Sequence, residues 1–104
     1  MRLADALFQQ GKTDAALENY EISLAAFENL IVKDPNNTEW QYDAAVCRLR
    51  IGEVFLKKKD VAKASGNFKA ALPILEKLVA QSPENVNRQR DLNQVKKHLE
   101  NLES

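Results

Sequence analysis

The stretch that decides the fold is Gly52-Glu53-Val54-Phe55-Leu56-Lys57-Lys58-Lys59-Asp60-Val61-Ala62-Lys63-Ala64. It sets small and aromatic side chains on both sides of a lysine-rich turn, and the spacing continues for two more turns. These small and aromatic positions are Gly52, Phe55, Ala64, Phe68 and Ala71. Apolar residues three or four apart predict two helices that face each other. Small residues let such helices cross closely, and the aromatic rings fill the space beside the crossing.

The same pattern occurs 48 residues earlier in the chain. Pro35, for example, precedes Pro83 by 48 residues. In that copy Ala4 and Leu7 stand where the later copy has Gly52 and Phe55, and Gly11 lies in the turn. Further matched pairs are Ala16 with Ala64, Tyr20 with Phe68, Leu24 with Leu72 and Asn37 with Asn85. An internal repeat of this length indicates stacked helical units rather than an irregular globule.

The apolar spacing and its breaks predict five helices and no strands. Proline and asparagine at 34–37 and 82–85 end one helix and cap the next, while Gly11 suits a left-handed helix end. Pro73 falls inside the fourth helix, where we expect a kink near Lys69. The expected ranges are 2–10, 14–33, 38–57, 61–81 and 86–102.

Composition excludes several classes of protein. The chain has 104 residues, 44% of them hydrophobic, with 15 Lys and Arg against 15 Asp and Glu. A neutral chain of this length indicates one folded domain without a nucleic-acid or membrane partner. No apolar run is long enough for a membrane span or a signal peptide. The single cysteine, Cys47, suits a reducing compartment, so we expect a cytoplasmic location.

The small and aromatic positions of both copies resemble the signature of tetratricopeptide repeats. The usual period of that family is about 34 residues. This chain repeats at the longer offset of 48, and the excess corresponds to about four helical turns. The chain is therefore similar to longer-helix variants of the family. The resemblance implies an all-α solenoid of antiparallel helix pairs that binds other proteins without catalysis.

We expect a single domain over residues 1–104. Repeat one covers about 3–50 and has a truncated first helix, while repeat two covers about 51–98 and runs into a capping helix at 86–102. The last helix should be a cap because Glu100 and Glu103 stand where repeat two has Gly52 and Phe55. Neither residue suits a close crossing with another helix.

No catalytic, cofactor-binding or metal-binding motif is present in the sequence, and we expect no enzyme. His98 lies in a polar stretch without other ligand-type residues at a metal spacing, which indicates an ordinary surface residue. Cys47 lies on an apolar stripe and is expected to be a buried small side chain rather than a nucleophile.

In repeat solenoids the first helix of each pair lines the concave surface. The resemblance therefore implies that a peptide or partner domain binds side chains that point away from the core on those helices. The expected partner-binding residues are Tyr42, Leu49, Glu53, Leu56, Lys57, Arg90 and Lys97, with Asp5 and Gln9 at equivalent positions.

A structural assembly unit that stacks on itself or on further repeats is the alternative function. Residues 1–52 carry five Lys and Arg against eight Asp and Glu, while residues 53–104 carry ten against seven. Such asymmetry favours contact between unlike ends. The short first helix also leaves apolar residues near Phe27 uncovered, which predicts a homodimer or a longer array.

Overall fold

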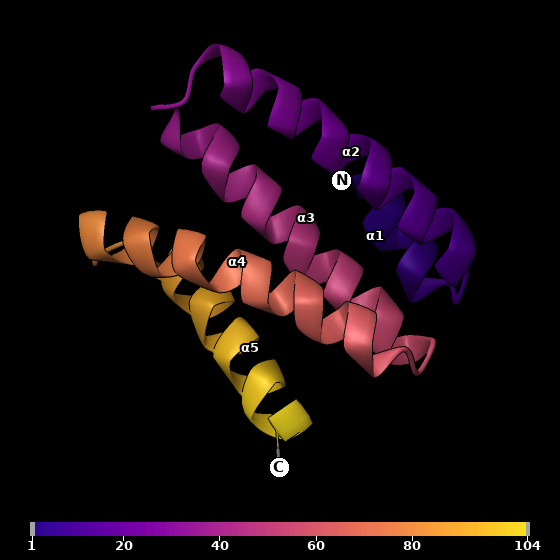
Figure 1. The fold of residues 1–104 in the computed structure, drawn as a ribbon. Coiled ribbons are helices and arrows are strands. Elements are labelled where there is room, and N and C mark those ends of the chain that lie inside the picture. The colour runs from indigo at the N-terminus through magenta and orange to yellow at the C-terminus, as the bar shows by residue number, and fades with distance from the viewer. Residues whose placement is uncertain (1, 104) are drawn as a thin grey trace.

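The computed structural model describes residues 2–103 and consists of five helices joined by short turns (Figure 1). Each helix packs antiparallel on the next one in the chain, which gives a stack of helix hairpins without strands among the described residues. The all-α fold and the five predicted helices are confirmed, with every boundary within one residue of its prediction. The helices are α1 (Arg2–Gln9), α2 (Thr13–Lys33), α3 (Thr38–Lys57), α4 (Val61–Gln81) and α5 (Val86–Glu103).

Side-chain caps start three of the helices where the sequence places Asn or Asp. The Asn37 side chain accepts a hydrogen bond from the Trp40 backbone N–H at 3.0 Å, and Asn85 does the same for Arg88 at 3.1 Å. Asp60 caps α4 in the same way, accepting from the Lys63 N–H. Each cap satisfies a backbone donor that the first helical turn leaves without a partner.

The turns of the two repeats also share their backbone geometry. Gly11 has a φ of 81°, and Lys59, its counterpart in the second repeat, has a φ of 63°. Both residues donate a backbone hydrogen bond back into the preceding helix at 3.0 Å. Glycine adopts this left-handed conformation without steric cost, whereas lysine adopts it with some strain. The turn is therefore imposed by the helices on either side of it.

The core consists of two clusters that meet at Phe55, the first built by α1, α2 and the end of α3 and the second by α3, α4 and α5. Side chains at the small and aromatic repeat positions are buried in it, and Phe55 is half-buried. The buried ones are Ala16, Tyr20, Ala64, Phe68 and Ala71, together with the backbone of Gly52. A Cβ atom added to Gly52 would lie 2.5 to 2.9 Å from three carbons of the Phe68 ring. At this crossing of α3 and α4 there is no room for a side chain.

Helix α4 continues through Pro73 without a break in its helical range.

Helix α5 differs from α3, its counterpart in the preceding repeat, in the side chains that it exposes. On α5, three exposed polar residues stand at the repeat positions of three α3 residues that are buried against α4. These pairs are Asn93 with Ala45, Lys97 with Leu49, and Glu100 with Gly52. This face of α5 is thus suited to water rather than to a closely packed helix.

Candidate functional site

A hollow of about 390 Å³ lies between α1 and α3 and reaches down to α2. Helix α1 contributes an acid, an aromatic ring and an amide, α2 contributes a tyrosine, and α3 contributes an ion pair. The lining residues are Asp5, Phe8, Gln9, Tyr20, Arg50 and Glu53. We call this space the α1–α3 hollow.

Hydrogen bonds fix the polar groups of the α1–α3 hollow. The Tyr20 hydroxyl donates to the Asp5 carboxylate, and Arg50 Nη1 donates to Glu53 Oε1 at 2.9 Å. Burial, followed by the hydrogen bond to Asp5, raises the pKa of Tyr20 above its usual range. The hydroxyl therefore stays protonated and acts as a donor. The hollow presents two carboxylates and one guanidinium beside two aromatic rings.

At the equivalent positions of the second repeat, two rings are stacked on each other. There Phe68 replaces Tyr20, and the His98 ring stacks on it with 4.7 Å between centroids and 12° between planes. His98 Nε2 also lies 3.1 Å from Glu53 Oε2, within hydrogen-bond distance. The prediction that His98 is an ordinary surface residue is wrong, because tertiary packing holds its ring between α3 and α4.

The structure separates the predicted partner-binding residues into different environments. Asp5, Gln9 and Glu53 meet in the α1–α3 hollow. Lys57 is exposed, whereas Leu56 is half-buried against the core cluster of α3, α4 and α5. Including Leu49 in a binding surface is wrong, because this side chain is 0% exposed between α3 and its neighbours.

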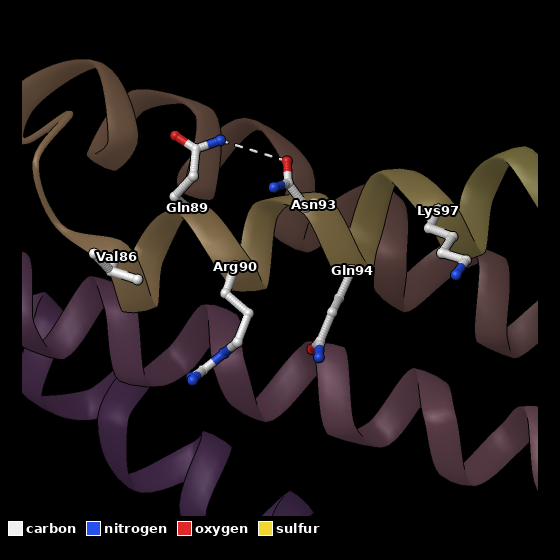
Figure 2. Close-up of a pocket in the computed structure, with 6 residues that line it drawn as sticks. All are labelled: Val86, Gln89, Arg90, Asn93, Gln94 and Lys97. Atoms are coloured by element: carbon white, nitrogen blue, oxygen red, sulfur yellow. Dashed lines mark hydrogen bonds between the residues drawn. The ribbon is translucent and has the colours of Figure 1, made fainter.

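The remaining predicted partner-binding residues are Tyr42, Arg90 and Lys97. Tyr42 is half-buried, and its hydroxyl donates to Asp91 of α5, so it joins two helices. Arg90 and Lys97 are exposed and line a shallow second hollow of about 380 Å³ on α5, shown in Figure 2. Its other lining residues are Val86, Gln89, Asn93 and Gln94.

Two buried charged residues at the start of α5 were not predicted. Arg88 is 6% exposed and donates from Nη2 to Glu39 Oε1 at 2.9 Å, while Asp91 is 1% exposed and accepts from Tyr42. The repeat carries a signal for Asp91, because Asp43 stands at the same position in the preceding unit. Nothing in the sequence marks Arg88, whose counterpart is Trp40.

The sequence profile of the tetratricopeptide repeat matches residues 1–64, which covers the first repeat, all of α3 and the start of α4. The chain belongs to the tetratricopeptide repeat family. No curated protein and no solved structure matches it. Tetratricopeptide repeat domains are in general interaction modules for other proteins, and repeats of this family are typically non-catalytic.

Two further findings bear on what this tetratricopeptide repeat domain does. Among residues 2–103, no group of three or more His, Cys, Asp or Glu side chains is arranged to hold a metal ion. Within the same range, each helix is too short or too polar to cross a bilayer. Cys47 is buried, as the sequence predicts.

Proposed function

We propose that the domain binds a segment of a partner protein across α1 and α3, and that a basic side chain of the partner enters the α1–α3 hollow. The single observation that carries this proposal is the charge of the hollow. Asp5 and Glu53 supply two carboxylates, while Arg50 supplies one guanidinium that Glu53 already binds. The partner of Asp5 is the neutral hydroxyl of Tyr20, so its negative charge is free to attract a cation.

The apolar walls of the hollow suit the same ligand. Phe8 and Tyr20 line it beside the carboxylates. Lysine and arginine side chains place a long apolar stem against such rings and keep the charged end next to an acid. Exposed Lys57 and Gln9, at equivalent positions of α3 and α1, extend the surface for the flanking residues of the partner.

Display of random peptides on the whole domain tests this function. We expect enriched peptides to contain a Lys or Arg, and Asp5→Asn to weaken their binding about tenfold through the loss of a charge-assisted contact. Glu18→Gln serves as the matched control, because Glu18 is an exposed acid on α2 outside the hollow. Enrichment of acidic or purely apolar peptides, or an equal loss in both variants, would contradict the proposal.

A self-assembling unit is the second candidate function, and the exposed apolar residues of α2 favour it. Ile22 and Val32 are 62% and 79% exposed, and Phe27 is half-buried on the same helix. A contact with a second copy of the chain would remove these apolar side chains from water. Light scattering after gel filtration decides this point. A dimer that Phe27→Glu dissociates would support assembly, and a monomer at high micromolar concentration would contradict it.

A further inference from the structure

Glu53 of α3 connects the two repeats through its carboxylate. On one side this carboxylate lines the α1–α3 hollow, where Oε1 accepts a hydrogen bond from Arg50 Nη1 at 2.9 Å. On the other side, Oε2 lies 3.1 Å from Nε2 of His98 on α5. The carboxylate therefore joins the hollow to a histidine that is not among the residues lining it.

The repeat places a basic side chain beside Glu53 twice. Arg50 and His98 are 48 residues apart, and so are Asp5 and Glu53. A guanidinium keeps its positive charge in proteins, whereas the charge of an imidazole changes between about pH 5 and pH 8. One of the two bases that contact Glu53 is therefore permanently charged, and the charge of the other depends on pH.

The His98 ring is held in place but remains accessible to water. It stacks on the fully buried Phe68 ring of α4 with centroids 4.7 Å apart, and its side chain is 26% exposed. A charged carboxylate only accepts hydrogen bonds, so Nε2 of His98 donates to Glu53. Uptake of a second proton, at Nδ1, adds a positive charge without breaking this contact.

The groups that face the His98 ring come from two other helices. Helix α3 contributes Glu53 with Arg50 bound to it, and α4 contributes the uncharged ring of Phe68. The residues of α5 one turn away are uncharged, namely Gln94, Val95, Asn101 and Leu102. The nearest further charges along α3 and α5 are the exposed Lys57 and Lys97. Glu53 is thus the acid through which the charge of His98 acts.

We propose that His98 is a positioning residue for Glu53, and that protonation of its ring weakens the binding of a basic side chain in the α1–α3 hollow. This inference rests on the function proposed for that hollow. While His98 is neutral, Asp5 and Glu53 exceed Arg50 by one negative charge. A protonated His98 cancels this excess at Glu53, so the hollow attracts a cation less strongly. By thermodynamic linkage, a bound cation favours the neutral ring.

A first test needs no ligand. The chain has one histidine, so its ring signals are identified directly in the NMR spectrum of the labelled domain. We expect the Arg50 Cζ signal to move with the same midpoint as the His98 ring signals between about pH 5.5 and pH 8. His98→Gln keeps a side-chain N–H donor but does not titrate, so the Arg50 signal should then stay constant. Independent midpoints, or movement that persists in His98→Gln, would overturn the positioning role.

A second test measures the binding of a blocked Gly-Arg-Gly tripeptide, whose guanidinium stays charged throughout this range. Its dissociation constant should rise about fivefold from about pH 7.5 to about pH 5.5. His98→Gln should bind at both pH values as the native domain does at the higher one. His98→Lys, with its permanent charge, should bind as the native domain does at the lower one. Lys97→Gln removes an exposed neighbouring charge and should keep the pH dependence.

The outcomes separate this inference from the function on which it rests. Equal binding at both pH values in the native domain, or equal weakening in His98→Gln and His98→Lys while circular dichroism stays native, would overturn the inference alone. The second result would mean that His98 only fills the space beside Phe68. A tripeptide that binds at neither pH would contradict the proposed function and, with it, the pH dependence of binding. The ligand-free titration would still decide whether His98 positions Glu53.

Discussion

Tyr20 and Phe68 occupy the same position of the two repeats, yet their surroundings differ. The Tyr20 hydroxyl bonds Asp5 and leaves a hollow open above it, whereas the Phe68 ring is covered by His98, which contacts Glu53. One oxygen atom separates the two side chains. The comparison teaches that the aromatic ring at this repeat position lies beside an open hollow in one repeat and under a stacked ring in the other, according to the group that contacts the carboxylate on the first helix.

The largest effect expected from this comparison is that of Gly52→Leu. Even a Cβ atom would lie 2.5 Å from the Phe68 ring, which is itself fully buried. The close crossing of α3 and α4 would be lost, and we expect a mostly unfolded protein by circular dichroism. Gly66→Leu is the matched control, because a Cβ there meets no atom within 4 Å. It should stabilise α4 by about 0.5–1 kcal/mol through helix propensity. Native stability of the Gly52 variant would refute the crossing.

Phe68→Ala should destabilise the domain by about 3–5 kcal/mol, measured by urea unfolding. The ring is 0% exposed between α3, α4 and α5, and its loss also removes the surface on which His98 stacks. Lys69→Ala, at the exposed neighbouring position, controls for changes in α4 itself and should cost less than about 0.5 kcal/mol. Equal unfolding midpoints of the two variants would show that Phe68 is not a core residue.

Substitutions at positions 68 and 98 of repeat two test the comparison between the two repeats further. Phe68→Tyr adds a hydroxyl that competes with His98 for Glu53, so this variant should be destabilised while His98 is present. In the His98→Ala background, the new hydroxyl can bond Glu53 as Tyr20 bonds Asp5. We expect a coupling free energy of about 1–2 kcal/mol in a double-mutant cycle of unfolding. Additive effects would mean that His98 and the hydroxyl do not compete for one carboxylate.

The smallest effect is expected at Cys47, whose counterpart in the next unit is Val95, and both side chains are 0% exposed. Cys47→Val should change the unfolding free energy by less than about 1.5 kcal/mol. Burial raises the pKa of the Cys47 thiol to about 11, so the thiol remains protonated at pH 8. A disulfide reagent should then react at the rate of unfolding. Rapid labelling of the native domain at pH 8 would contradict this packing.

Only some of the residues that line the α1–α3 hollow were among the predicted partner-binding residues. The repeat positions of Asp5, Gln9 and Glu53 were predicted because they share one face of the first helices. Leu49 was misassigned because the sequence cannot tell which neighbour covers a given side of α3. His98 was misassigned because its contacts, Phe68 and Glu53, lie on other helices and follow no local pattern.

The sequence by itself determined the helices and their order. Capping side chains, turn residues and the apolar spacing within each repeat act over a few residues, so their effects can be inferred without knowledge of distant neighbours. Only the tertiary structure decided that His98 covers Phe68, that Tyr42 bonds Asp91 and that Phe27 remains half-buried. These outcomes depend on how far each helix extends beside the next and on groups far apart in sequence, because burial is a property of the packed assembly rather than of any one segment.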